Sequence, residues 1–194
     1  MCSSDLKNGF VIGNTEYRRD GTKKRTAASA FVLGVAKILA KEGSYDEWKR
    51  GAELMNTEGL ELFCLPLLCG FGSPLMRLTK ISGLSVCFTG GTGIGKSGAL
   101  YCGASLFGDP KKLSLSGNKK NSATDNALIQ WMVNLKNIMM PLDEASNRPA
   151  DEVSDLIHKV SDGKSKLRMH GSSDALREIQ SDTSLIAFLT SNQS

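Results

Sequence analysis

The stretch that decides the fold is Gly90-Gly91-Thr92-Gly93-Ile94-Gly95-Lys96-Ser97, which fits the phosphate-binding pattern G-x-x-x-x-G-K-[ST]. A mostly apolar run, Leu84–Thr89, leads into these glycines, and a helix is predicted to follow over Lys96–Phe107. Glycines let backbone N–H groups approach phosphate oxygens without a Cβ in the way, and the helix N-terminus adds partial positive charge. We therefore expect all eight residues to form a nucleotide site, with Lys96 reaching the β- and γ-phosphates and Ser97 binding Mg²⁺.

A second motif places two acidic residues after a buried strand. The run Ile138–Leu142 is apolar and delivers Asp143 and Glu144 at its carboxyl end, where open α/β sheets bind their ligands. Asp143 is expected to hold Mg²⁺, directly or through water, and Glu144 to activate the attacking water as general base. Alone, the pair could be two solvated loop acids. Its position one strand–helix unit after a phosphate loop favours the catalytic interpretation.

A polar group also follows a third apolar run. Leu185–Thr190 ends in Ser191-Asn192, and Asn192 could orient the attacking water or touch the γ-phosphate. Asparagine at a strand end is common in ordinary turns, which is the alternative. The order and spacing of the three motifs favour the functional role.

The spacing of apolar residues predicts an α/β fold with a parallel sheet over residues 81–194, preceded by a small, mostly helical accessory region at 7–80. Besides the runs above, the sheet is expected to include Leu113–Leu115, and helices are expected at Thr124–Leu135, with Ser122 or Thr124 as cap, and at Pro149–Ser161. In the accessory region we expect a hairpin between 10–16 and 18–25 around Asp20-Gly21, helices at Thr26–Lys41 and Tyr45–Met55, and a mostly buried segment, Leu60–Leu78. Ser44 and Glu47 form a predicted capping box for the second helix.

Two basic segments raise the question of nucleic-acid contact. The turn around Asp20 carries Arg18, Arg19, Lys23, Lys24 and Arg25, for which a solvated turn is the simpler interpretation and a nucleic-acid contact the alternative. Between Gly163 and Gly171, the basic residues Lys164, Lys166, Arg168 and His170 alternate with other types. If that segment is extended, all four lie on one face and could contact the DNA backbone, while a solvated edge strand remains the other interpretation.

The composition limits which classes of protein the chain can belong to. A chain of 194 residues with 40% hydrophobic and 23% charged residues is an ordinary globular domain, and a net charge of +4 permits an acidic partner without establishing one. Its five cysteines include no CxxC pair, so reduced buried thiols are expected rather than a zinc site or disulfides. The apolar runs 30–40 and 60–76 are short and interrupted, and we expect no membrane span.

The order of phosphate loop, Asp-Glu strand, basic insert and Asn strand resembles the additional-strand ATPases, the AAA+ and superfamily III helicase group. More narrowly, the chain resembles the domain-of-unknown-function 927 family of phage and mobile elements. The matching stretches are Asp46-Glu47-Trp48-Lys49, Phe63–Leu78, Gly90–Ser97, Ala104-Ser105-Leu106-Phe107-Gly108-Asp109-Pro110, Ser122–Leu128 with its core Ala123-Thr124-Asp125-Asn126, Leu142-Asp143-Glu144, Gly163-Lys164 and Arg168.

This resemblance implies a helicase-like ATPase using ATP and Mg²⁺, which acts on single-stranded or forked DNA in phage or mobile-element replication. It further implies a ring of identical subunits in the cytoplasm of a prokaryotic host, with a virus-encoded gene as one option. Members of the family include inactivated forms, but Lys96, Ser97, Asp143 and Glu144 are all intact here. A further strand, a lid and an arginine finger would normally follow Asn192, so we expect the core to be incomplete at its C-terminus.

Two other classes of function stay open from the sequence. A small-molecule or nucleotide kinase would use the same loop, but it would not need a water-activating Glu144. A non-catalytic, nucleotide-dependent assembly module would bind ATP and oligomerise without stimulation by DNA.

Overall fold

The fold is given by a computed structural model of the chain. It describes the backbone of residues 4–5, 9–12, 14–27, 30–117, 125–163, 169–170, 173–176 and 184–192, and the side chains of 9–12, 14–27, 32–117, 128–163 and 184–192.

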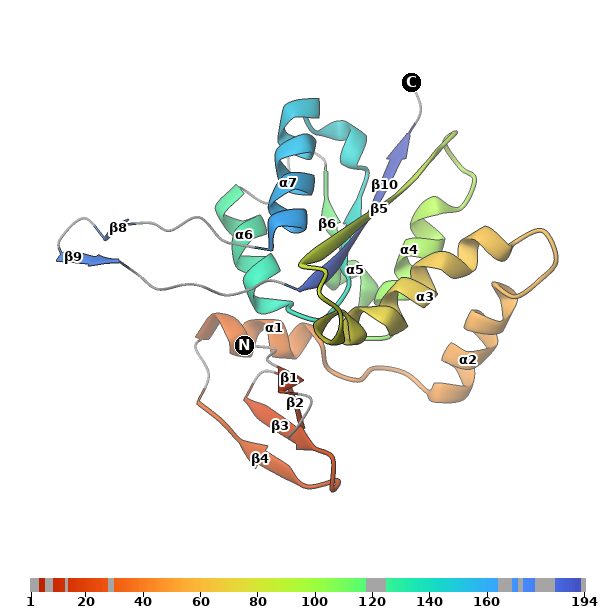
Figure 1. The fold of residues 1–194 in the computed structure, drawn as a ribbon. Helices are drawn as coiled ribbons and strands as arrows, with labels where there is room; N and C mark the ends of the chain where they lie inside the picture. Colours follow the sequence, from red (N-terminus) through yellow and green to blue (C-terminus); the bar gives the residue numbers. More distant parts are fainter. Residues whose placement is uncertain are drawn as a thin grey trace.

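A parallel four-stranded sheet forms the centre of the molecule (Figure 1). Its strands are β5 (Gly83–Gly90), β10 (Leu185–Asn192), β7 (Met140–Asp143) and β6 (Leu115–Ser116), in the order β5-β10-β7-β6. The last strand in the chain therefore lies between the strand that enters the glycine-rich loop and the strand that ends in the acids. This confirms the predicted α/β fold with its additional strand.

Helices cover both faces of this sheet. Figure 1 shows α6 (Asp125–Asn134) and α7 (Ala150–Asp162) on one side, and α3 (Leu65–Gly72) and α4 (Lys96–Ala104) on the other. Leu113, which we predicted to begin a strand, is instead the last residue of the short helix α5 (Pro110–Leu113). That prediction was wrong because Asp109 caps a helical turn here, accepting hydrogen bonds from the N–H groups of Lys111 and Lys112.

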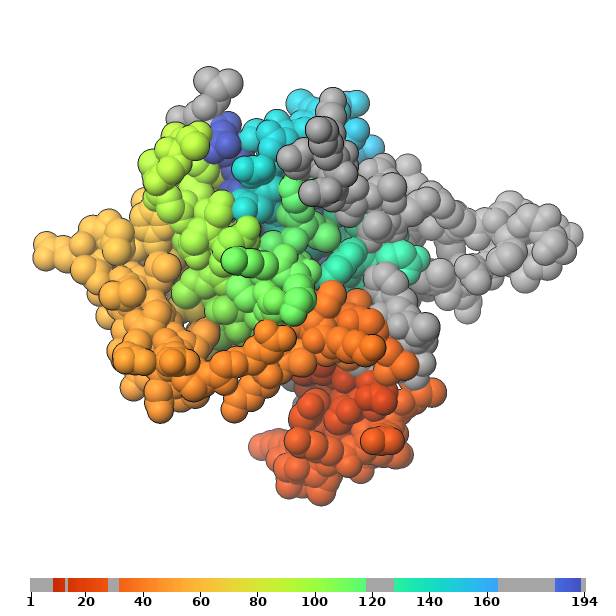
Figure 2. All heavy atoms as spheres, turned by 180° about the vertical axis from the view of Figure 1, so that it is seen from behind, coloured from red at the N-terminus to blue at the C-terminus, as the bar shows by residue number. Residues whose placement is uncertain are grey.

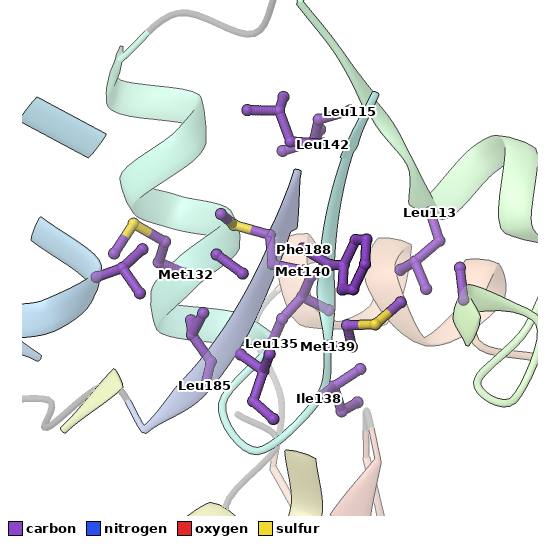
Figure 3. Packing of buried hydrophobic residues seen from close by; sticks show 14 of the residues in the cluster. Leu113, Leu115, Met132, Leu135, Ile138, Met139, Met140, Leu142, Leu185 and Phe188 are labelled. Atoms are coloured by element: carbon purple, nitrogen blue, oxygen red, sulfur yellow. The ribbon is translucent and has the colours of Figure 1, made fainter. Parts of the chain in front are cut away.

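The core lies between the sheet and these helices (Figure 3). Its fully buried side chains include Phe188 and Leu185 of β10, Met140 and Leu142 of β7, and Leu135 after α6. Strand β10 is buried along its first six residues, as expected for a central parallel strand. Because β10 is central, its carboxyl end is held rigidly between those of β5 and β7.

The N-terminal residues form a separate antiparallel sheet followed by two helices. The strands are β1 (Ser4–Asp5), β2 (Gly9–Ile12), β3 (Thr15–Arg18) and β4 (Lys23–Arg25), and the helices are α1 (Ala30–Ile38) and α2 (Tyr45–Leu54). The predicted turn at Asp20-Gly21 joins β3 and β4. The predicted cap of α2 is also present: the Glu47 N–H donates to Ser44 Oγ at 3.3 Å, and the Ser44 hydroxyl donates to Glu47 Oε2 at 2.9 Å.

The expectation of a mostly buried segment at Leu60–Leu78 was wrong. The segment is η1 (Glu61–Cys64), α3 and η2 (Ser73–Leu78), and only the face with Pro66, Cys69, Gly70, Ser73 and Met76 is buried. Leu62 is 75% exposed and Leu68 62% exposed. Residues 62–76 contain no charged side chain, so the sequence could not show which side faces α4 and β10.

By length and composition alone, Glu61–Leu78 could cross a membrane. In the structure, however, the segment is broken into three short helices, and one face of it is buried. Both features are typical of a segment that packs at the edge of a protein core. Residues Val35, Leu39, Cys69 and Met76 belong to the same buried cluster as the sheet. The predicted division at residue 80 therefore coincides with no gap in the hydrophobic packing, and the two-part organisation stays a prediction.

Candidate nucleotide site

The glycine-rich loop connects the end of β5 to the start of α4. Gly93 has φ 83° and Gly95, the N-cap of α4, has φ 95°, a conformation that other residues adopt only at a cost. Beside the loop lies a cavity of about 280 Å³. It is lined by Thr92, Gly93, Gly95, Lys96, Ser97, Gly98, Glu144, Thr190 and Asn192. The tertiary structure thus brings residues from all three predicted motifs to one cavity.

Three of the predicted loop residues, Gly90, Gly91 and Ile94, are not among those that line this cavity. Gly90 and Gly91 instead contribute carbonyl groups. Ile94 is 52% exposed, and its Cδ1 atom would lie 2.7 Å from a Cβ built on Gly90. Because that atom is the end of a flexible and half-exposed side chain, this contact alone does not require a glycine at position 90.

Lys96 is 7% exposed, and its ammonium group lies inside the loop. Nζ donates to the carbonyl oxygens of Gly90 at 2.9 Å and Gly91 at 2.6 Å. A buried ammonium needs such partners, since burial without them costs several kcal/mol. These two contacts keep Nζ beside the cavity, where phosphate oxygens could replace the carbonyls.

Asp143 is the centre of a hydrogen-bond network at the end of β7. Its Oδ1 accepts from the hydroxyls of Ser97 at 2.9 Å and Thr190 at 2.5 Å, and its Oδ2 accepts from Tyr101 at 3.1 Å. Burial, followed by the charge of Asp143, raises the pKa of Tyr101 above its ordinary value, so the phenol stays protonated and donates.

The oxygen donors in this network fit a magnesium ion. Ser97 Oγ and an Asp143 oxygen are hard ligands that already lie within hydrogen-bond distance of each other. No group of three or more His, Cys, Asp or Glu side chains that could hold a metal ion is found in the described residues, at this site or at another. A magnesium ion held by one or two protein oxygens takes its remaining ligands from phosphates and water, which is its usual arrangement in phosphoryl-transfer sites.

Glu144 stands next to the cavity in a left-handed conformation, with φ 54° and ψ 47°. Its N–H donates to Thr190 Oγ1 at 2.9 Å and to Asp143 Oδ1 at 3.2 Å, and Asn147 Nδ2 donates to its Oε2 at 2.9 Å. A non-glycine residue in this conformation costs roughly 1–2 kcal/mol, and such strain concentrates at functional sites. Asn147 thus holds the Glu144 carboxylate, and Glu144 is among the residues that line the cavity.

Asn192 is the last residue of β10 and lies opposite Gly90 in the ladder between β10 and β5. Its N–H donates to Ser146 Oγ at 3.2 Å. The strand is two residues longer than predicted, so Asn192 is held by the sheet instead of a turn. Asn192 lines the cavity, and its contact with water or γ-phosphate stays a prediction.

Sequence reasoning missed Thr190, Tyr101 and Asn147. Thr190 lies two residues before Asn192 and therefore on the same face of β10, and Tyr101 lies four residues after Ser97 on the same face of α4. These two spacings could have identified both. Asn147 follows a loop acid by three residues, which is too common a spacing to have drawn attention.

Of the four predicted DNA-facing residues, the structure describes only His170, and of that residue only the backbone. Lys164, Lys166 and Arg168 lie outside the described residues. His170 lies in β8 (Met169–His170), which pairs antiparallel with β9 (Ser173–Leu176), and its side chain is not described. Whether the four basic residues share one face stays a prediction.

Comparisons with known proteins place this site in a family context. A family model described as "Domain of unknown function (DUF927)" matches residues 3–180. The solved structure of the active helicase Cch of SCCmec type IV is 25% identical with a TM-score of 0.58, and the match covers 80% of this chain. The chain spans only 28% of that helicase.

More distant matches include NtrX from Brucella abortus in complex with ATP and with ADP. These two are 9% and 12% identical, with TM-scores of 0.37 and 0.35, and the matches cover 84% of this chain and 37% and 34% of theirs. No match is found among curated proteins.

Proposed function

Because the chain belongs to the DUF927 family and has a helicase-like P-loop ATPase fold resembling that of the Cch helicase, we propose that it binds and hydrolyses ATP to drive work on DNA. The observation that carries the proposal is the meeting of Lys96, Ser97, Glu144 and Asn192, from three separate segments, around one cavity next to Asp143. A kinase would need the loop and the magnesium ligands, but it would not need Glu144 presented beside them.

In the proposed reaction, the loop N–H groups and Lys96 hold the β- and γ-phosphates of ATP. Ser97 and Asp143 hold Mg²⁺, which when bound neutralises charge that develops on the phosphate oxygens. Glu144 accepts a proton from water as the water oxygen forms a bond to the γ-phosphorus. The bond from that phosphorus to the β–γ bridging oxygen breaks, and ADP and phosphate leave. Asn192 orients the water.

The DNA part of the proposal rests on the similarity to a helicase and on the basic segment that contains Lys164, Lys166, Arg168 and His170. We extend it to single-stranded or forked DNA as substrate, a homo-oligomeric ring as the working form, and replication of phage or mobile elements in a prokaryotic cytoplasm as the setting.

The test is ATP hydrolysis by the purified chain with and without single-stranded DNA. Lys96→Ala is the blank, because it removes the cation that faces the phosphates. Glu144→Gln should retain ATP binding, measured by a fluorescent ATP analogue, and lose hydrolysis by about 100-fold or more, since general-base catalysis contributes factors of this order. Equal hydrolysis by Glu144→Gln and the unmodified chain would contradict the role of Glu144.

DNA coupling is tested by replacing Lys164, Lys166 and Arg168 with alanine. The expected result is loss of DNA stimulation with unchanged ATP binding. A matched control replaces Lys49, Lys80 and Lys111, three exposed lysines outside that segment, and should keep the stimulation. Hydrolysis without any stimulation would favour a nucleotide-dependent assembly or regulatory module.

A further inference from the structure

Strands β3 and β4 and the turn between them form a basic hairpin (residues 15–25) that projects from the body of the molecule. Figure 2 shows this part as the red-to-orange lobe standing away from the core. The turn is well defined: Asp20 Oδ1 accepts from the N–H of Thr22 at 2.8 Å and from its hydroxyl at 2.6 Å. The Arg18 N–H also donates to the Thr22 carbonyl at 2.9 Å.

The acids of the basic hairpin are already engaged, while most of its cations are not. It holds five basic residues and two acidic ones, a net charge of +3. Asp20 holds the turn, and Glu16 pairs with Arg18 at 3.3 Å. Within the part of the chain that the structure describes, no carboxylate pairs with Arg19, Lys24 or Arg25, and all three are exposed.

An exposed aromatic ring lies among these cations. Tyr17 is 42% exposed, and Lys23, its partner across the β3–β4 ladder, has its Nζ 5.2 Å from the centre of the tyrosine ring. Cations that track a phosphate backbone, next to a ring on which a base can stack, are the two features used to bind single-stranded nucleic acid.

We propose that the basic hairpin is a binding surface for single-stranded nucleic acid. Arg19, Lys24 and Arg25 contact phosphates, and Tyr17 stacks on a base. This surface uses other residues than the nucleotide cavity and the basic segment 164–170, and it deepens the proposed DNA function by naming a second contact. Binding through it needs no ATP, so its failure and the failure of the ATPase proposal can be told apart.

The experiment measures fluorescence anisotropy of a labelled oligothymidine of about 20 nucleotides, without nucleotide, across a series of salt concentrations. Replacing Arg19, Lys24 and Arg25 with alanine should weaken binding at least about tenfold at low salt. It should also reduce the slope of log K against log salt by about 2, as loss of three phosphate contacts on a single strand predicts.

The matched control replaces Arg50, Lys80 and Lys111, which are exposed basic residues elsewhere, and removes the same charge. It should bind like the unmodified chain. Equal loss in the two triple variants would overturn the proposal, because only net charge would then matter. Equal retention would overturn it too, and would make the hairpin cations a protection of edge strand β4 against aggregation.

Tyr17→Leu separates stacking from charge. It should weaken binding of the oligothymidine roughly tenfold without changing the salt slope, and leave binding to a duplex of the same length unchanged. Unaltered binding of the single strand by Tyr17→Leu would remove Tyr17 from the proposal and with it the preference for single strands. Circular dichroism of each variant checks that the hairpin substitutions leave the fold intact.

Discussion

Thr190 connects the two acids of the site at the level of single atoms. Its hydroxyl donates to Asp143 Oδ1 and accepts from the Glu144 N–H, so one oxygen holds both the carboxylate expected to bind magnesium and the backbone of the expected base. Thr190 is 2% exposed, so both hydrogen bonds are shielded from solvent. The strained conformation of Glu144 depends on this contact, because the N–H would otherwise have only Asp143 as partner, at 3.2 Å.

Thr190→Val should therefore impair hydrolysis more than binding. Valine has the same shape but no hydroxyl, and the lost hydrogen bonds should cost about 1–3 kcal/mol of folding stability. We expect ATP affinity to change less than about threefold and the rate of hydrolysis to fall at least about tenfold, measured by phosphate release.

Thr190→Ser is the control and should keep most of the rate, because it restores the hydroxyl. A Val variant with an unchanged rate would show that Glu144 is positioned by its other contacts.

Among the elements, α3 and α4 approach each other through glycine. A Cβ on Gly103 of α4 would overlap the carbonyl oxygen of Pro66, and a Cβ on Gly70 of α3 would lie 2.9 Å from the carbonyl oxygen of Gly103. The close approach holds α4, and with it the phosphate loop, against the segment that precedes β5.

Gly103→Ala should destabilise the protein by about 1–3 kcal/mol, because a backbone carbonyl cannot rotate away from the new methyl group. Gly51→Ala, inside α2 with open space around it, should stabilise by about 0.5–1 kcal/mol through helix propensity. Urea denaturation of the two variants measures the change in the free energy of unfolding, which should be negative for Gly103→Ala and positive for Gly51→Ala. If both variants were more stable than the unmodified chain, helix propensity, and not the contact with the Pro66 carbonyl, would determine the effect of alanine at position 103.

The two sides of the Glu61–Leu78 segment provide a second test at this scale. Met76 is 6% exposed and Leu68 is 62% exposed, although both are large apolar residues in one segment. Met76→Ala should cost about 2–5 kcal/mol, and Leu68→Ala should stay within about 0.5 kcal/mol. A large loss for Leu68→Ala, measured by thermal unfolding, would show that its side of the segment is covered in solution.

At the scale of the whole molecule, the strand order β5-β10-β7-β6 brings the ends of three strands that are distant in the sequence next to one another at one site. Register pairs Asn192 with Gly90 and Leu189 with Leu142, so the carboxyl ends of the three longer strands lie at one edge. A ligand that contacts all three should therefore tie the sheet together and oppose global unfolding.

Nucleotide should raise the melting temperature of the whole chain. ATP with Mg²⁺ at about 100 times its dissociation constant should stabilise Glu144→Gln, chosen to prevent turnover, by about 2.7 kcal/mol. For a chain of this length that is a shift of roughly 5–10 °C. The shift should shrink with EDTA and vanish in Lys96→Ala, while Lys111→Ala should keep it. A shift that persists in Lys96→Ala would place the nucleotide outside the loop.

The glycine loop, the acids after a buried strand and the alternation of strand and helix were readable from the sequence because each is a local pattern. A run such as Leu185–Thr190 is buried on both faces and therefore continuous, and Ser44 with Glu47 caps a helix over one turn. Leu113 was misplaced because Asp109, four residues earlier, could cap a helix as well as precede a strand. The exposed leucines at 62 and 68 could not be recognised, since residues 62–76 contain no charged side chain that would mark the solvent side.

By itself, the sequence determined the chemistry available: a glycine-rich loop with its lysine and serine, two acids and an asparagine, each at the end of an apolar run. Only the tertiary structure decided that β10 lies between β5 and β7, that Thr190 and Tyr101 hold Asp143, and that Glu144 lines the same cavity as Lys96 and Asn192. The physical reason is that local patterns depend on neighbouring residues, whereas strand order and the contacts across it depend on how the whole apolar surface is buried at once.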